Sequence, residues 1–211
     1  MPNRFFITGT DTGVGKTVVA ATLCVGLNAT YWKPVQTGTR EGSDRVTVMR
    51  IAGIPRARTI PEVYRFSPPV SPHLAARRAN VRINLKAIGR AAPAVSETLI
   101  AEGAGGALVP INEKQLMTDL MAELGLPVLL VTRTTLGTIN HTLLSIAALK
   151  AARLKLHGVI MVGKPNRENL RAIEDYGGAR VIGVLPPLPR LNRAVLMAAF
   201  RAKFDERAFQ Q

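Results

Sequence analysis

The chain is poor in cysteine, aromatic residues and long apolar runs. One cysteine, Cys24, occurs in 211 residues, so no internal disulfide is possible and a reducing compartment is expected. Aromatic residues make up 5% of the chain against 47% apolar residues, which predicts an aliphatic core. No apolar run approaches the roughly 18 residues of a membrane-spanning helix, and the N-terminal run is read as a first strand rather than a signal peptide. We therefore expect a cytoplasmic globular protein without a membrane partner.

A shortage of acidic residues gives the chain a strong positive charge. It has 28 Lys and Arg against 14 Asp and Glu, a formal net charge of +14. This balance is typical of nucleic-acid binding, but the arginines are scattered from Arg40 to Arg207 without interleaved aromatic residues to stack on bases. We therefore predict no nucleic-acid partner. A basic genome composition or polyanionic substrates explain the charge equally well.

What the chain does contain is a glycine-rich segment, Gly9 to Thr17 (GTDTGVGKT), between an apolar run and a helical pattern. A strand, a turn and a helix N-terminus in that order present backbone N–H groups and the helix dipole to an anion. Lys16 would add a point charge for the outer phosphates of a nucleotide, and the Thr17 hydroxyl would hold magnesium. The standard spacing places the first glycine of this motif at Thr10, whereas here Gly9 comes one residue early.

Short apolar segments alternate with helical patterns along the rest of the chain. Continuous apolar strands between helices predict a parallel sheet covered on both faces. We expect a single α/β domain over residues 1–211, a doubly wound, three-layer fold of the P-loop NTPase type. Strands are expected at 5–7, 31–35, 63–66, 98–101, 127–132, 157–162 and 180–185. Helices are expected at 17–28, 44–52, 71–79, 84–97, 115–124, within 136–152, at 166–176 and at 192–207.

Polar residues follow several strands, at the edge where an open parallel sheet binds ligands. Glu102 comes directly after the apolar strand residues 98–101 and is expected to be a magnesium ligand beside the phosphate loop. Asp44 begins a helix that Ser43 can cap, and the sequence leaves open whether Asp44 binds metal or only interacts with the helix dipole. Lys33 faces the same edge, although such a lysine, taken alone, is more typical of the surface.

The three histidines, His73, His141 and His157, do not form a recognisable site. They lack metal-binding spacing with each other or with Cys24. No Ser-His-Asp or Cys-His constellation can be argued from the sequence, so nucleophilic catalysis of those kinds is not predicted.

Six segments together resemble the dethiobiotin synthetase family of the biotin pathway. In that family the phosphate loop is longer by one residue, so the early Gly9 becomes a point of similarity. The segments occur in the family's order and are 9–17, 33–38 (KPVQTG), 43–44 (SD), 71–73 (SPH), 102–106 (EGAGG) and 136–141 (LGTINH).

The resemblance implies a magnesium- and ATP-dependent cyclo-ligase. One amine of 7,8-diaminopelargonic acid takes up CO2 (supplied as bicarbonate) to give a carbamate, whose oxygen attacks the γ-phosphate of ATP. The second amine then closes the cyclic urea of dethiobiotin and expels phosphate. Such phosphoryl transfer depends on positioning and charge neutralisation more than on a strong acid or base. The family also implies a homodimer whose active site spans the interface.

The same resemblance assigns roles to residues of this chain. Lys16 and Lys33 would be catalytic, neutralising the moving phosphoryl and carbamate charges. The implied nucleotide-binding residues are Thr12, Gly13, Val14, Gly15, Lys16, Thr17, Val162, Gly163 and Pro186. The implied magnesium ligands are Thr17, Asp44 and Glu102. The implied substrate-binding residues are Thr37, Gly105 and, at a helix start of the partner subunit suited to the tail carboxylate, Gly137, Thr138, Ile139 and Asn140.

Two positions depart from the family's pattern. Gly13 stands where a glutamate is frequent, which removes one polar contact to the substrate. Val162, Gly163 and Lys164 stand where an asparagine usually reaches the adenine edge, and an aliphatic side chain cannot form that pair of hydrogen bonds. We therefore expect the protein to accept several nucleoside triphosphates.

Three other functions fit parts of the pattern. A partition or septum-site ATPase switch shares the phosphate loop, but such proteins carry a lysine at the position of Asp11. A related amide-forming ligase that acts on a corrinoid precursor usually carries a glutaminase domain, for which this chain is too short. A binding protein that has lost catalysis is opposed only by the presence of Lys16, Lys33, Asp44 and Glu102.

Overall fold

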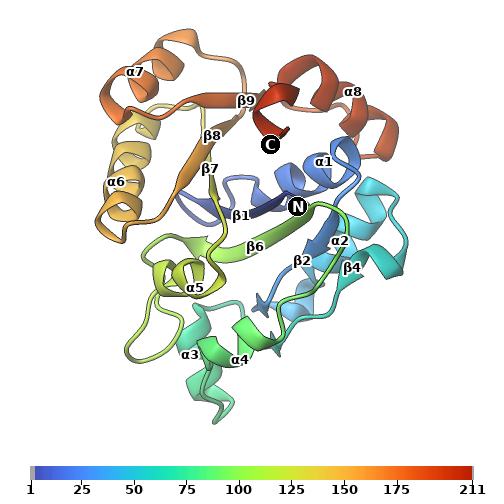
Figure 1. Ribbon diagram of the computed structural model, residues 1–211, viewed down its shortest axis with the longest axis vertical. Helices are drawn as coiled ribbons and strands as arrows, with labels where there is room; N and C mark the ends of the chain where they lie inside the picture. Colours follow the sequence, from blue (N-terminus) through green and yellow to red (C-terminus); the bar gives the residue numbers. More distant parts are fainter. Residues whose placement is uncertain (1–2, 211) are drawn as a thin grey trace.

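Seven strands form a parallel sheet in the computed structural model, which describes residues 3–210 (Figure 1). In sequence order they are β1 (Arg4–Gly9), β2 (Thr30–Trp32), β4 (Thr59–Ile60), β6 (Leu99–Gly106), β7 (Val128–Arg133), β8 (Leu156–Val162) and β9 (Val181–Leu185). Their order across the sheet is β4-β2-β6-β1-β7-β8-β9, so the chain starts in the middle and winds outward in both directions. Two further short strands, β3 (Val35–Gln36) and β5 (Tyr64–Arg65), pair with each other beside the main sheet.

Helices cover both faces of the sheet, as the doubly wound prediction requires. One face carries α1 (Lys16–Gly26), α2 (Asp44–Ala52) and α8 (Arg193–Lys203). The other carries α3 (Pro72–Arg78), α4 (Leu85–Arg90), α5 (Met117–Leu124), α6 (Thr138–Ala151) and α7 (Arg167–Gly177). Short 3-10 helices lie at η1 (Thr39–Glu41), η2 (Arg56–Arg58) and η3 (Glu206–Phe209). Over residues 3–210, each helix falls short of the length and apolar character that crossing a membrane demands.

Side-chain caps fix where several helices begin. The Ser43 hydroxyl accepts a hydrogen bond from the backbone N–H of Val46 at 3.3 Å, which confirms the predicted cap and start of α2. Asn166 and Asn192 cap α7 and α8 in the same way. These caps satisfy N–H groups that the first turn of a helix otherwise leaves unpaired.

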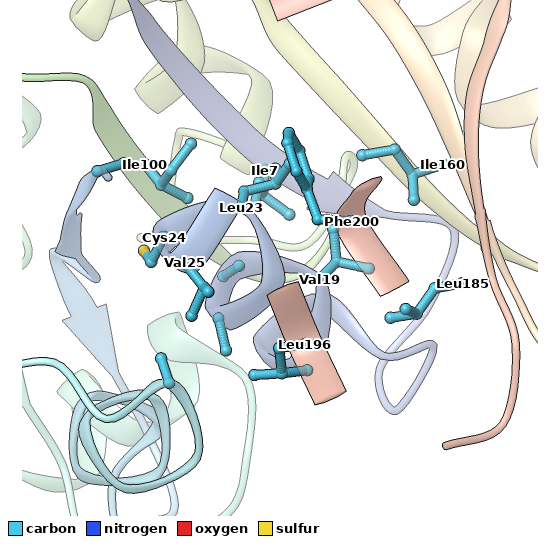
Figure 2. Close-up of a cluster of buried hydrophobic side chains, with 14 of the residues drawn as sticks. Ile7, Val19, Leu23, Cys24, Val25, Ile100, Ile160, Leu185, Leu196 and Phe200 are labelled. Atoms are coloured by element: carbon cyan, nitrogen blue, oxygen red, sulfur yellow. The ribbon is translucent and has the colours of Figure 1, made fainter. Parts of the chain in front are cut away.

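The core between the sheet and the first helix is aliphatic with a few phenylalanines (Figure 2). Val19 and Leu23 of α1 pack with Ile7 of β1 and Phe200 of α8, all fully or almost fully buried. Cys24 lies in the same cluster, and burial raises the pKa of its thiol, so it behaves as the buried small hydrophobe that the sequence suggested.

Two predicted boundaries are wrong near prolines. The strand expected over 31–35 is split into β2 and β3, because Pro34 has no N–H and the chain leaves the main sheet after Trp32. The helix expected over 84–97 ends at Arg90, three residues before Pro93.

Two predictions about strands also need correction. The expected strands do not include residues 59–60, but Thr59 and Ile60 form the edge strand β4, paired with β2. The strand expected at 98–101 is longer than predicted: β6 continues through Glu102 to Gly106 because its backbone stays paired with β1. Glu102 therefore lies within a central strand, and its carboxylate has a more rigid support than a loop provides.

The final helix is also shorter than expected and ends at Lys203.

Candidate active site

A cavity of about 670 Å³ opens beyond the carboxyl ends of β1 and β2 and beside the end of β6. This is the edge where an open parallel sheet binds ligands, and the volume suits a small molecule. Pro69, Val70 and Pro72 contribute to its apolar lining. The predicted site residues that line it are Thr12, Gly13, Gly15, Lys16, Thr17, Lys33, Thr37, Asp44, Glu102 and Gly105.

The phosphate loop requires glycine at two places. Gly15 has φ 101° immediately before α1, in the left-handed region that other residues rarely adopt. A Cβ on Gly9 would lie 2.8 Å from a methyl group of Val14, so the early glycine lets the longer loop fold back on itself. Val14 turns its side chain into the core, where it is 2% exposed, and offers a ligand only its backbone.

Lys16 begins α1 and lies against its own loop. Its Nζ donates a hydrogen bond to the backbone carbonyl of Asp11 at 2.8 Å. Burial is the main reason that its pKa falls from 10.5 to about 8, and the nearby Glu102 carboxylate partly opposes that fall. A bound phosphate would favour the charged form of Lys16, because it adds negative charge beside the ammonium group.

Lys33 connects the two carboxylates of the site. Its Nζ lies 2.5 Å from Oδ2 of Asp44 and 3.1 Å from Oε1 of Glu102. Its side chain is only 6% exposed, so the lysine expected to be a surface residue when taken alone is buried between two anions. Burial by itself would lower the pKa of Lys33, but the attraction of both carboxylates and their hydrogen bonds raises it above its ordinary value.

The same cluster contains the oxygen atoms expected to hold magnesium. Thr17 Oγ1 lies 3.1 Å from Oδ1 of Asp44 and 3.0 Å from Oε1 of Glu102, although its single proton can be donated to only one of them at a time. Burial would raise the pKa of Asp44, but Lys33 outweighs that effect and lowers it, so Asp44 is charged at neutral pH. In the described residues no set of three or more His, Cys, Asp and Glu side chains converges on a metal position. A metal here would therefore depend on two carboxylates and a hydroxyl, the hard oxygen donors that Mg2+ prefers.

Comparison with known proteins identifies the family. A family model described as an AAA domain matches residues 3–195. The ATP-dependent dethiobiotin synthetase BioD of Agrobacterium fabrum is 48% identical over 205 residues, covering 97% of this chain and 96% of the relative. The enzyme of the same name from Rhodopseudomonas palustris strain TIE-1 is 46% identical over 209 residues, 99% of this chain and 98% of the relative. The chain belongs to the dethiobiotin synthetase family.

Solved structures show how widely the fold is shared beyond the dethiobiotin synthetase family. A ParA family ATPase from Chlorobium tepidum covers 100% of both chains with a TM-score of 0.59 at 11% identity. The septum site-determining protein MinD from Pyrococcus horikoshii, solved with Mg-ADP, gives a TM-score of 0.57 at 16% identity and covers 99% of this chain and 93% of its own. Likeness at this level of identity concerns the fold alone. These ATPases are only 11% and 16% identical to this chain, whereas the dethiobiotin synthetases are 48% and 46% identical over almost its whole length. The comparisons therefore do not favour the partition or septum-site ATPase alternative.

Some residues that the dethiobiotin synthetase resemblance assigned to ligands lie away from the cavity lining. Val162 packs against the phosphate loop, since a Cβ on Gly15 would lie 3.0 Å from its Cγ1. Gly163 and Pro186 follow β8 and β9, neighbouring strands, at the same edge of the sheet. The start of α6, residues 137–140, does not line this chain's own cavity within the described structure.

The sequence predicted no role for three polar residues that lie near the site. Tyr31 donates its hydroxyl proton to Oε2 of Glu102 at 2.9 Å. The Gln36 side chain accepts a hydrogen bond from the Asp44 backbone N–H at 3.1 Å, which helps fix the start of α2. Arg133, exposed at the end of β7, extends to the Thr12 carbonyl at 3.4 Å. Two of them had a sequence signal. Gln36 lies in the 33–38 segment of the family resemblance, and Tyr31 stands two residues before Lys33 in an extended segment, so both side chains point to the same side.

Proposed function

We propose that this chain is an ATP- and Mg2+-dependent dethiobiotin synthetase that converts 7,8-diaminopelargonic acid and CO2 into dethiobiotin, ADP and phosphate. The observation that carries the proposal is the buried Lys33 held between Asp44 and Glu102 beside the phosphate loop. Relatives named ATP-dependent dethiobiotin synthetase, 46 to 48% identical over almost the whole chain, support it. It is the penultimate step of biotin biosynthesis.

The roles of the chain's own groups follow from charge and position. The N–H groups of the phosphate loop and the start of α1 bind the nucleotide phosphates. Lys16 lies where the outer phosphates belong, and Lys33 lies where a carbamate oxygen would approach the γ-phosphate. When that oxygen forms its bond to phosphorus and ADP departs, both ammonium groups offset negative charge. Thr37, which lines the same cavity, is proposed to orient the diamine so that its second amine can attack the carbamate carbon and release phosphate.

Magnesium is proposed to bind the oxygen atoms of Thr17, Asp44 and Glu102. Their convergence within hydrogen-bond distance suits a small hard cation with oxygen ligands. When bound, the ion would supply charge neutralisation at the β- and γ-phosphates. Lys33 already contacts both carboxylates, so metal and lysine would share the same pair of anions.

The direct test is product formation. The purified chain is incubated with diaminopelargonate, bicarbonate, Mg2+ and ATP, and dethiobiotin is sought by mass spectrometry. We expect dethiobiotin and phosphate in equal amounts, with each omission abolishing the product. Phosphate release that is independent of the diamine, without dethiobiotin, would reject the synthetase assignment in favour of an ATPase.

Nucleotide selectivity is proposed to be weak, because Val162 offers no hydrogen bond to a base edge and its side chain packs on Gly15. We expect kcat/KM values for ATP, CTP and GTP within about 10-fold of one another, because an apolar side chain at this position cannot distinguish the hydrogen-bonding edges of the bases. Val162→Asn restores an amide and is expected to raise the preference for ATP. A wild-type preference for ATP far above that range would contradict the proposal.

We further propose that the active unit is a homodimer with a shared substrate site. The groove between the phosphate loop and α6, about 380 Å³, is flanked by Leu108 and Leu144, which are 58% and 62% exposed. Leu136, before α6, is fully exposed as well. A second copy is the occupant proposed for this apolar face. Residues 137–140 do not line this chain's own cavity, which supports their serving the partner's site at a helix N-terminus.

Mixing two defective variants tests the shared site. Lys33→Ala removes the catalytic lysine, and Asn140→Asp places a negative charge where the tail carboxylate would bind. Each homodimer should be impaired at low diamine concentration. In a mixed dimer, one site combines an intact Lys33 with an intact Asn140 from the other subunit. We expect about a quarter of wild-type activity after subunit exchange, whereas a site contained within one subunit would give no recovery above that of Asn140→Asp.

Two further expectations belong to this proposal. We propose that residues 1–211 act as one domain, supported by a single main sheet whose strands come from Arg4 to Leu185. We also propose that the protein acts in the cytoplasm, where a buried thiol such as Cys24 stays reduced.

A further inference from the structure

Glu102 makes different contacts with its two carboxylate oxygens. Oε1 is 3.0 Å from Thr17 Oγ1 and 3.1 Å from Lys33 Nζ, on the side of the cavity. Oε2 accepts the hydroxyl proton of Tyr31 at 2.9 Å, on the side of the core. A carboxylate can rotate about its last bond and exchange these oxygens. Complete exchange regenerates the same contacts, because the two oxygens are equivalent, but every intermediate rotation breaks the bond from Tyr31. The Tyr31 contact therefore holds the plane of the carboxylate.

Tyr31 is itself held firmly. Its side chain is fully buried in the cluster that contains Cys24 and Val25 of α1. Its backbone belongs to β2, which pairs with β6 such that Tyr31 lies opposite Ile100, two residues before Glu102. The tyrosine and the carboxylate that it contacts therefore come from adjacent strands of the same sheet, and neither depends on a loop.

We propose that Tyr31 is a positioning residue that fixes the plane of the Glu102 carboxylate, so that one oxygen faces Thr17 and the metal position while the other stays bonded to the Tyr31 hydroxyl. This inference rests on the proposed binding of Mg2+ by Thr17, Asp44 and Glu102. Tyr31 contacts neither substrate nor metal, and it acts only through Glu102. Without its hydroxyl group the carboxylate keeps its charge but loses its fixed orientation, and the buried Oε2 loses its donor.

The test compares Tyr31→Phe with the wild type in a binding experiment that requires no turnover. Mn2+ binding to the ADP complex is measured by electron paramagnetic resonance, and ADP binding is measured by calorimetry with Mg2+ and with EDTA. We expect Mn2+ affinity to fall about 10-fold, which is typical when a hydrogen-bond partner of a metal ligand is removed. ADP affinity in EDTA should stay within about 2-fold, because the phosphate loop is unchanged.

Two controls separate positioning from general destabilisation. Tyr64→Phe removes a tyrosine hydroxyl that contacts the backbone N–H of Asn84, outside the site, and should leave Mn2+ affinity unchanged. In a Glu102→Gln background, the further change Tyr31→Phe should have little effect on Mn2+ affinity, because both act through the same group.

The outcomes are distinguishable. If wild-type ADP binding does not depend on the metal, the proposed magnesium site fails and the role of Tyr31 fails with it. If the wild type depends on the metal and Tyr31→Phe binds Mn2+ equally well, the magnesium site stands and the positioning role is rejected. A lower melting temperature with unchanged Mn2+ affinity would reject it in the same way, since it would show a structural role alone.

Discussion

Replacing Lys33 by alanine is expected to lower kcat for dethiobiotin formation by about 1,000-fold, which corresponds to about 4 kcal/mol of transition-state stabilisation. Lys33 is buried, charged and directed by two carboxylates into the phosphate cavity. No other lysine apart from Lys16 lines that cavity in the described structure, so no neighbouring ammonium group can replace it. Steady-state kinetics with saturating diamine and ATP measure the loss.

The same substitution should change how the protein responds to magnesium. Without Lys33, the carboxylates of Asp44 and Glu102 face each other without their shared cation, which lowers the stability of the folded state. A divalent cation would neutralise both. We therefore expect Mg2+ to raise the melting temperature of Lys33→Ala more than that of the wild type.

Two further variants serve as controls for the Lys33→Ala experiment. Lys33→Met keeps most of the side-chain volume and should lose as much activity as Lys33→Ala, which would show that charge matters more than packing. Lys155→Ala removes an exposed lysine just before the start of β8, at the edge of the sheet away from the cavity. This variant should have wild-type kinetics. A folded Lys33→Ala protein that retained a tenth or more of wild-type kcat would contradict the catalytic role.

The largest expected effect on stability comes from Gly26→Ala. A Cβ on Gly26 would lie 2.3 Å from two ring carbons of Phe200, which is 2% exposed and surrounded by Phe204 and Phe209 (Figure 2 shows its place against α1). The ring cannot move without disturbing the packing of α8 on α1. We expect a loss of about 2 kcal/mol in the free energy of unfolding, measured by urea denaturation.

A matched glycine and a second-site change test this explanation. Gly89 lies within α4, where the nearest neighbours of an added Cβ belong to the flexible side chain of the exposed Glu123, so Gly89→Ala should be neutral or stabilising. In a Phe200→Leu background, Gly26→Ala should cost clearly less, because the colliding ring is gone. Equal losses for Gly26→Ala and Gly89→Ala would show that the collision is not the cause.

Local sequence predicted much of the fold and part of the site. The phosphate loop from Gly9 to Thr17 and the Ser43-capped helix α2 were recognisable because their glycine spacing and helix cap lie within a few residues of each other in the sequence. The split at Pro34 and the continuation of β6 through Glu102 depend on which strand lies alongside, and that information is not local.

The internal arrangement of the site was less accessible from the sequence. Tyr31 and Glu102 are 71 positions apart, and their hydrogen bond exists only because β2 and β6 are neighbours in the sheet. The buried state of Lys33 depends in the same way on Asp44 and Glu102 approaching it from a helix and a strand. Periodicity predicts the face on which such residues lie, but not which partners they meet there.

The continuation of β6 through Glu102 has a consequence for how the site responds to ligands. Glu102 lies between β1 and β2 in the middle of the sheet, so its backbone can open to solvent only when the most stable part of the molecule unfolds. The segment from Thr37 to Ser43, part of which also lines the cavity, contains only a short 3-10 turn and is expected to rearrange at lower free energy. Closure around a substrate is therefore expected to be asymmetric: one wall adapts, while the carboxylate keeps its place throughout the catalytic cycle.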